Sequence, residues 1–487
     1  MREDHTASTT GQLKYELVMR NVLSIILIFL YTNNYGQQEG KTFAYAKTGV
    51  LGVWKSIGDG YLLKADDKAI TLYSYTSKYC YKEQNDYLSD LINTSSKFYL
   101  NRTKDTLSLY LQDFGAKTKE LQSEKNFYRL KELPENCITL SETQLNDSEY
   151  LFELFWSTLK ENYAFAKERN LDWDKIYNDY KPKITSKTPK NDLFNLLGEI
   201  VILTKDQHTK IISADGSTRQ YSGVPTALLL GEIFKQQDTV KDFNSYISQF
   251  FKTNYDNISN DLLKGDGKKV ANGKIEWGAI SPDIGYIHLH ALTGFAPNSL
   301  PRKQQLDTLN FYMCQIMESF ESKKAIIIDV SFNFGGYDAA GLTISGYFTD
   351  KPTKAYTKYI FQNKNFYKGT EFLVNPSTKY QFTKPVYVLT TDISRSAAES
   401  FVMQMKSLPN VKVVGTNTLG IISDMLGKSI GDFYLTLSNE KYLTPTGDMY
   451  EVKGVEVDIK LTVFPKENMF NGHRDAVRQI IKIIEKE

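Results

Sequence analysis

A serine stands between a predicted strand and a predicted helix in PVYVLTTDISRSAAES, residues 385–400. Ser396, with Glu399 three residues later, fits a capping box, in which the serine caps the helix and the glutamate returns to the cap. A serine at a strand-to-helix turn is also expected to be exposed, and the next backbone N–H, that of Ala397, can face a developing oxyanion. The stretch therefore allows a helix cap, a nucleophile or both in one residue.

A glycine pair follows a second predicted strand, in KAIIIDVSFNFGGYD. In open α/β sheets, reactive groups collect beyond the carboxyl ends of the strands, and both this segment and Ser396 lie at such ends. Gly335 and Gly336 could turn their N–H groups inward and form half of an oxyanion hole. The pair could equally serve a tight turn that requires glycine dihedrals.

A serine nucleophile needs a base, and the chain has five histidines. His5 lies in the leader and His473 beside the last predicted helix, whereas His208, in TKDQHTK, ends an apolar helix. His288 and His290 alternate on a predicted strand and face the same side, a spacing that metal sites use. Because no nearby Cys or His offers a third ligand, we predict no metal and no cofactor.

Four motifs occur in an order that carries a resemblance: DVSFNFGG, SRSAAE, VVGTNTLG and YEVKGVEVDI. Together they resemble the catalytic domain of the tail-specific, or C-terminal processing, serine peptidase family. KDQHT is similar to the DgHT element of the branch that includes the tricorn core protease and the interphotoreceptor retinoid-binding protein. The resemblance covers His208 and residues 274–461, and its specificity comes from the ordered set.

The resemblance implies roles for individual residues. Ser396 matches the nucleophile, His208 the general base and Glu451 the carboxylate that completes the site. Gln207 stands where the tricorn enzyme has a serine and is a candidate orienting residue. The oxyanion hole would be formed by the backbone N–H groups of Ala397 and of the glycine pair, Gly335 and Gly336.

The sequence also departs from the family pattern. Ile421 stands where the bacterial processing peptidases have the lysine of a Ser-Lys dyad, and Lys428 is out of register, so the dyad is excluded. Residues 209–274 lack the glycine-led carboxylate-binding loop of a PDZ domain, so capture of a free C-terminus is not supported. Ser331 and Val457 replace an arginine and a proline that are frequent in the family.

Bulk properties limit the remaining function classes. The chain has 487 residues, enough for two to four domains, and 59 basic against 57 acidic residues give a net charge of +2. Such a balance offers no field that would attract nucleic acid. We therefore predict no nucleic-acid partner.

Strand and helix patterns predict a multidomain α+β chain. It would comprise a small β-rich N-terminal domain, a helical domain carrying His208, a helical insertion without a PDZ domain, and an α/β catalytic domain. The resemblance implies the tail-specific protease (ClpP/crotonase-like) type for the last of these. The predicted boundaries are 1–37 for a leader, 41–140, 141–215, 216–273 and 274–487.

Residues 19–31, MRNVLSIILIFLY, combine a basic start with a short apolar run, as a signal peptide does. Met19 would then be the true start of the protein. The alternatives to a signal peptide are a membrane anchor or a buried N-terminal helix. We expect periplasmic or secreted localisation and no stable span after leader removal. Cys80 and Cys137 could pair in an oxidising compartment, whereas Cys314, in an apolar-periodic helix, is expected to be an inert buried thiol.

These features predict an exported serine endopeptidase acting on unfolded or peptide substrates through an acyl-enzyme. The alternative is a non-catalytic ligand-binding protein on the same fold, because fold does not fix function. An esterase is less favoured because Ser396 lacks the G-x-S-x-G elbow. Substrate preference, oligomeric state and a lid role for residues 216–273 are left open.

Overall fold

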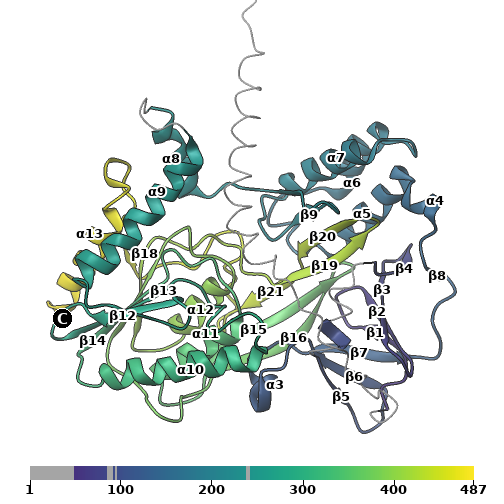
Figure 1. The fold of residues 1–487 in the computed structure, drawn as a ribbon. Coiled ribbons are helices and arrows are strands. Elements are labelled where there is room, and N and C mark those ends of the chain that lie inside the picture. Colours follow the sequence, from purple (N-terminus) through teal and green to yellow (C-terminus); the bar gives the residue numbers. More distant parts are fainter. Residues whose placement is uncertain (1–48, 85–90, 94–95, 237–241) are drawn as a thin grey trace, which may run out of the picture.

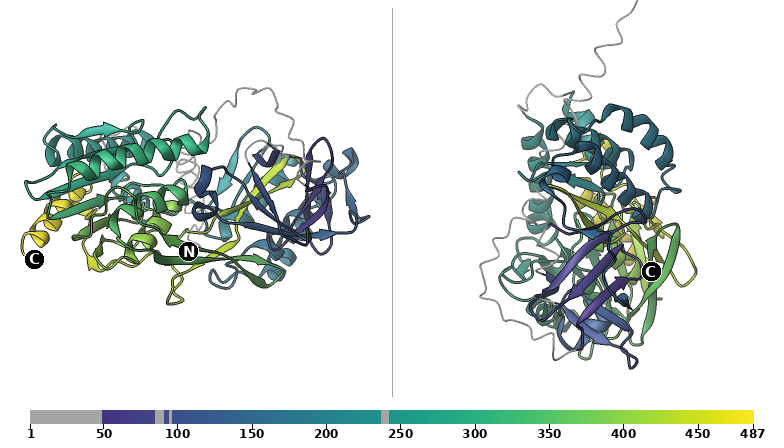
Figure 2. Two further views of the ribbon diagram at one scale, coloured as in Figure 1. Left: turned by 90° about the horizontal axis from the view of Figure 1, so that it is seen from below. Right: turned by 90° about the vertical axis from the view of Figure 1, so that its right-hand side faces the viewer.

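The computed structural model describes residues 49–84, 91–93, 96–236 and 242–487. The predicted signal peptide lies outside these residues. Among the described helices, none is both long and apolar enough to cross a membrane. Seen from below, the molecule is elongated, with the N-terminal sheet near one end and the C-terminal helix at the other (Figure 2).

The N-terminal part forms an eight-stranded sheet in the order β5-β6-β7-β1-β2-β3-β4-β8. All neighbours are antiparallel except β4 and β8. Trp54 is fully buried in its core. The strands are β1 Gly52–Ser56, β2 Tyr61–Ala65, β3 Ile70–Tyr75, β4 Cys80–Lys82, β5 Lys97–Leu100, β6 Thr106–Tyr110, β7 Lys125–Leu130 and β8 Cys137–Ile138; η2 Gly115–Lys117 and α3 Thr118–Leu121 lie between β6 and β7.

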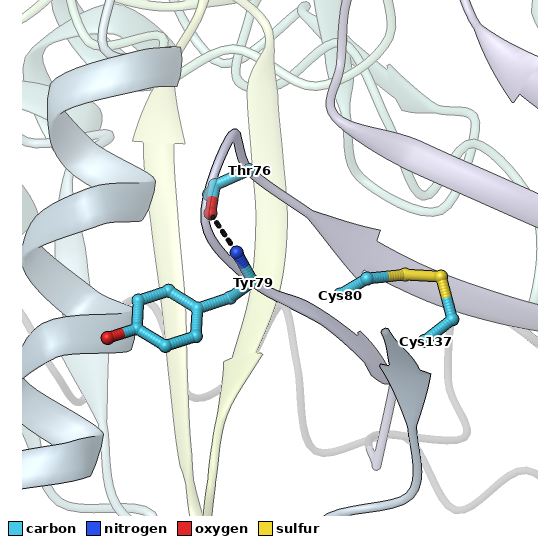
Figure 3. Close-up of a disulfide and its surroundings, with 4 residues drawn as sticks. All are labelled: Thr76, Tyr79, Cys80 and Cys137. Carbon is cyan, nitrogen blue, oxygen red and sulfur yellow. Dashed lines mark hydrogen bonds between the residues drawn. A yellow bond between two sulfur atoms is a disulfide. The ribbon is translucent and has the colours of Figure 1, made fainter. Parts of the chain in front are cut away.

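A disulfide joins β4 to β8 (Figure 3). Cys80 and Cys137 are register partners in the parallel pairing, with Cα atoms 4.4 Å apart. Cys314 is a partly buried free thiol whose Sγ lies 3.1 Å from the Tyr347 hydroxyl. The crosslink therefore ties the last strand of the sheet to its neighbour.

Replacing both disulfide cysteines with serine is expected to lower the free energy of unfolding. The bridge spans a sequence separation of 57 residues. Restraining a loop of that length in the unfolded chain contributes about 4 kcal/mol in the chain-entropy model. Urea unfolding of the Cys80→Ser/Cys137→Ser protein should show this loss, and Cys314→Ser, the matched control, should not. Equal stability of all three proteins would contradict the expectation.

Helices follow the N-terminal sheet. The Ser141 side chain and Gln144 form a capping box, and the Asp147 side chain caps the longest of these helices, whose buried face includes Leu151 and Phe155. They are α4 Glu142–Leu145, α5 Ser148–Asn162, α6 Trp173–Tyr180, η3 Lys181–Lys183 and α7 Lys190–Leu203. Residues 204–209 then lead into β9 Lys210–Ile212, which pairs with β10 Thr218–Gln220 and β20 Phe433–Ser438.

The C-terminal half contains a seven-stranded sheet in the order β11-β12-β13-β14-β17-β18-β22. Its first three strands are antiparallel, and β13 to β22 are parallel. The central strand AIIID is buried throughout, as expected for a strand covered on both faces. The strands are β11 Lys268–Val270, β12 Ile275–Ala279, β13 Ile284–Leu289, β14 Ala325–Asp329, β17 Val386–Thr390, β18 Val411–Gly415 and β22 Ile459–Lys460.

Helices cover both faces of this sheet (Figure 1). Ile326 and Ile328 join the core formed with α10, α11 and α12, whereas Ile327 joins the core formed with α9 and α13. This alternation follows from the two-residue period of a strand. The helices are α8 Pro225–Phe234, α9 Phe243–Asp256, the π-helical turn η4 Asn257–Leu262, α10 Arg302–Ser319, α11 Asp338–Ser345, η5 Gly346–Phe348, α12 Ala397–Lys406, η6 Lys466–Asn468 and α13 Gly472–Ile484.

Two smaller sheets complete the fold. One has the order β10-β9-β20-β19, with β19 spanning Met425–Ile430, so the segment after His208 pairs with a segment far along the chain. The other has the order β16-β15-β21, formed by β15 Thr353–Gln362, β16 Asn365–Val374 and β21 Glu440–Leu443. Both lie between the N-terminal sheet and the seven-stranded sheet in Figure 1.

Candidate active site

Ser396 is the N-cap of α12, at the turn that follows the buried strand β17. Its backbone has φ 58° and ψ −131°, a conformation that L side chains rarely adopt. Such strain costs about 1–3 kcal/mol and persists where surrounding contacts enforce it. Here the Ser396 N–H donates to the Ile421 carbonyl at 3.0 Å and to Glu399 Oε2 at 3.2 Å. The serine is partly exposed and held in a fixed, strained position.

Glu399 secures the same turn from inside the protein. Its buried carboxylate accepts hydrogen bonds from Thr418 Oγ1 at 2.5 Å, Gly420 N at 2.7 Å and Ile421 N at 2.8 Å. Burial raises the pKa of Glu399 to about 7, although these hydrogen bonds act in the opposite direction. Together with the bond from Ser396, these contacts are those of a capping residue.

The glycine pair packs directly against the serine. A Cβ on Gly335 would lie 2.7 Å from Ser396 Cβ and 2.9 Å from Ala397 N, and its φ of 101° also favours glycine. The Gly335 N–H already donates to Asn333 Oδ1 at 2.8 Å. Gly336 is exposed, and Ala397 is the first residue of α12, whose N–H has no partner within the helix. The N–H groups of Ala397 and Gly336 are therefore the candidate oxyanion donors at this turn.

His208 lies between α7 and β9 and is half-buried. Its Nδ1 is 2.7 Å from the Ser423 carbonyl, an acceptor, which assigns the proton to Nδ1 and a lone pair to Nε2. The His208 N–H donates to Asp206 Oδ1 at 2.8 Å. Burial lowers the pKa of the imidazole below its usual value, and the Asp206 carboxylate partly offsets this. The neutral imidazole is thus favoured at neutral pH.

Two buried carboxylates and one arginine lie behind the histidine. Glu451 Oε1 is 3.3 Å from an Arg169 guanidinium nitrogen, and Glu451 Oε2 accepts from Ile422 N at 2.8 Å and Ser423 N at 3.0 Å. Burial would raise the pKa of Asp206, but Arg169, followed by His208, outweighs it and holds that pKa low. Burial, and then Asp206, raise the pKa of Glu451 to about 8. Asp206 is therefore the carboxylate that acts on the charge of the imidazole, and it raises the pKa of His208 against the effect of burial.

The segment 420–424 connects the residues predicted from the sequence. Ile421 accepts from Ser396, and Ser423 bonds both to the His208 ring and to Glu451. In the described part of the chain, no direct hydrogen bond joins the His208 ring to Ser396. Catalytic hydrogen bonds are often formed only when substrate is bound, so the pairing of His208 with Ser396 is tested by mutation.

Gln207 contacts an arginine rather than the histidine ring. Its Oε1 accepts from Arg395 at 2.7 Å, and Arg395 also lies over the Phe334 ring, 4.4 Å from the centroid. This bond connects the residue before His208 to the residue before Ser396. The bond therefore links the segment that carries His208 to the turn that carries Ser396.

Lys428, the lysine nearest to the dyad position, points elsewhere. It lies in β19, where its ammonium donates to the Gly60 carbonyl at 2.5 Å and faces the Tyr61 ring. Burial lowers its pKa to about 7, against the attraction of Glu83. Its contacts are thus made with the N-terminal sheet.

Sequence reasoning missed three contributors to this arrangement. Asp206 stands two residues before the histidine in KDQHT, and this spacing, in which a carboxylate bonds the N–H two residues on, could have indicated it. Arg169 and Ser423 have no local signal, because their contacts join residues more than 200 positions apart.

Comparisons with known proteins agree with the motifs. Residues 283–461 match the model of "Peptidase family S41", and residues 146–201 match "Tricorn protease C1 domain". The first range contains Ser396, the glycine pair and Glu451; His208 lies between the two ranges. The predicted family resemblance and fold class are confirmed.

Three known proteins show the extent of the likeness. The "Carboxy-terminal processing protease CtpA" of Bacillus subtilis is 29% identical over 147 residues, which are 30% of this chain and 30% of that protein. The crystal structure of a candidate peptidase from Parabacteroides merdae is 21% identical and covers 69% of this chain and 96% of its own, with a TM-score of 0.54. The latter supports the fold alone. The crystal structure of the tricorn protease covers 87% of this chain and 45% of its own, at 14% identity and a TM-score of 0.41.

Proposed function

This chain carries a peptidase family S41 domain, and from that premise we propose that the protein is an exported serine endopeptidase. Ser396 would attack the peptide carbonyl, and His208 Nε2 would accept the serine proton. The observation that carries the proposal is Ser396 itself: a partly exposed serine in a strained turn, packed against Gly335 at the start of α12. A cap alone does not require that strain.

The chemical steps follow from the donors and acceptors around Ser396. Its oxygen forms a bond to the carbonyl carbon, and the resulting oxyanion would accept N–H bonds from Ala397 and Gly336. His208 then gives its proton to the leaving amine, which departs as the C–N bond breaks and an acyl-enzyme remains. Water then attacks the acyl carbon while His208 takes a proton from it, and His208 passes that proton to the serine oxygen as the bond between the acyl carbon and the serine oxygen breaks.

Glu451 is proposed as a positioning residue. Glu451 accepts a hydrogen bond from the Ser423 N–H, and the Ser423 carbonyl accepts one from His208 Nδ1. Glu451 would therefore fix the tautomer of His208 through the backbone of Ser423. Asp206 is the carboxylate whose charge favours the imidazolium, because it acts to raise the pKa of His208. This assigns to two residues the roles that a triad carboxylate combines.

We propose unfolded proteins or peptides as substrates and an extracytoplasmic location. The disulfide supports an oxidising compartment, in which such bonds persist. The ligand-carrier alternative requires an apolar cavity at the serine. One cavity, of about 360 Å³, lies between α3, α10 and β16, and its lining, which includes Phe114, Leu306 and Tyr347, contains none of the proposed site residues.

Incubation of the purified protein with reduced casein tests the proposal. We expect new peptides that accumulate with time and whose termini are read by mass spectrometry. Hydrolysis of small esters without peptide cleavage would instead indicate an esterase. If the folded protein cleaves neither casein nor small esters, the ligand-binding function is favoured.

Gly335→Ala is expected to lower kcat/KM by about 10²-fold or more, because its Cβ would displace Ser396 and the Ala397 N–H. Gly447→Ala is the matched control: its φ of 88° imposes a similar dihedral strain, but the added Cβ meets nothing within 4 Å. Rates are measured with a fluorogenic casein. Similar rates in the two variants would show that the close packing at Gly335 is unimportant.

A further inference from the structure

A second cluster of reactive side chains lies on the first antiparallel pair of the seven-stranded sheet. Glu276, on β12, is the register partner of His288 at the end of β13, and His290 follows two residues later. Because side chains alternate along a strand, all three project from the same face. The third ligand that sequence reasoning did not find is thus a carboxylate on the neighbouring strand.

The three side chains converge at short range. One ligand atom from each lies within 4.8 Å of the others, and the rings of His288 and His290 have centroids 4.0 Å apart. Glu276 is 1% exposed, His288 is fully buried and His290 is partly buried. The cluster is therefore largely shielded from water.

Several atoms of the cluster lack hydrogen-bond partners within the described structure. These are both ring nitrogens of His288, Nε2 of His290 and Oε2 of Glu276. The nearest approach between the last two is 3.7 Å. Leaving a buried donor or acceptor unsatisfied costs about 1–3 kcal/mol, so an arrangement with several such atoms calls for a missing partner.

The surroundings orient the cluster. Ser259, on the π-helical turn η4, donates to Glu276 Oε1 at 2.6 Å and leaves Oε2 turned toward the histidines. The Tyr255 ring lies 5.8 Å and 5.1 Å from the rings of His288 and His290, centroid to centroid. A bonded outer partner and a hydrophobic cover are the features that surround ligated metals in proteins.

We propose that Glu276, His288 and His290 bind a divalent transition-metal ion, for which zinc is the reference. Two imidazoles and a carboxylate are a donor set that zinc takes, with bonds of about 2.0–2.2 Å, and the partly exposed side of His290 leaves a fourth position for water. Such bonds bring ligand atoms to about 3.3 Å from one another, so the side chains close inward on binding.

Lys269 acts against the ion. Its ammonium lies 3.6 Å from Glu276 Oε2 and competes with a cation for that oxygen. The lysine side chain is 56% exposed, so it can turn into solvent when the carboxylate is ligated. Removing this ammonium should therefore strengthen metal binding.

The position of the cluster suggests a structural role. Tyr255, at the end of α9, packs against Phe332 with ring centroids 5.5 Å apart, and Phe332 lies three residues before Gly335. An ion here would fasten α9 and η4 to the sheet beside the loop that supports the serine. The proposed peptidase steps use no metal, so metal binding and catalysis can be tested separately.

The test is titration of the metal-depleted full chain with zinc in the presence of a chromogenic chelator. We expect one equivalent bound per chain and a rise in the thermal midpoint. Glu276→Gln and His290→Ala should each abolish that equivalent, whereas Lys269→Met should retain it with equal or higher affinity. These two variants leave the fully buried His288 unchanged, so the test does not require a substitution at that position.

Two results would overturn the proposal. One is the absence of a bound equivalent in a chain shown by circular dichroism to be folded. The other is an equivalent that persists in both Glu276→Gln and His290→Ala, which would place the zinc on other groups. Neither result bears on casein cleavage, because Glu276 and His290 have no part in the proposed mechanism.

Discussion

Ser396→Ala is expected to lower kcat/KM for peptide hydrolysis by about 10³-fold or more, because no other group in the proposed mechanism can form the acyl-enzyme. Circular dichroism and the thermal midpoint should change little. The Ser396 contacts that hold the turn, to Ile421 and Glu399, are made by its backbone N–H, which alanine keeps.

Ser407→Ala is the matched control for that variant. Ser407 is the C-cap of the same helix α12, and its hydroxyl donates to the Gln404 carbonyl. Casein cleavage by this variant should stay within about twofold, since changes away from the named contacts of a site have small effects. Equal activity of the Ser396→Ala and parent proteins would show that this serine serves only as a cap.

His208→Ala is expected to lower kcat/KM by about 10³-fold, because it removes the proton acceptor. Combined with Ser396→Ala it should cost no more than either change alone, since the two residues act as one unit. Thr436→Val is the control, because the Thr436 hydroxyl donates to the backbone carbonyl of His208. Full additivity in the double variant would mean that the two residues do not share a step.

The pH profile tests the same base. His208 must be neutral, with Nε2 unprotonated, to act as the base. Because burial lowers the pKa of His208, kcat/KM should rise with pH through an apparent pKa below the ordinary 6.5. Asp206 acts to raise that pKa. Asp206→Asn should therefore move the acid limb to lower pH. A shift to higher pH would contradict the placement of this charge.

Much of the site arrangement could be predicted because its signals are local. The alternation of buried strands and helices indicated the α/β part, and a serine followed three residues later by glutamate indicated the start of α12. Gly335 and Gly336 were identified from their place after β14, and their positive φ angles agree with the requirement for glycine. Hydrophobic periodicity and turn-forming residues depend on neighbours along the chain, so they can be recognised in a single sequence.

Other features depend on contacts between distant segments. The Gly335 N–H is engaged by Asn333, which a motif does not reveal. Arg169 lowers the pKa of Asp206, which is the carboxylate near His208. Arg169 and Asp206 lie on different segments, so no local pattern in the sequence indicates this interaction. Glu276 is brought beside His288 by strand register, and register is fixed by tertiary packing. Such pairs need the fold before they can be recognised.

Labelling with a serine-reactive fluorophosphonate, located by peptide mass spectrometry, tests the central claim most directly. The account predicts one adduct per chain on Ser396, none in Ser396→Ala, and slower labelling in His208→Ala, since the reagent reports an activated serine. An adduct on another residue, or equal labelling of the Ser396→Ala protein, would contradict it.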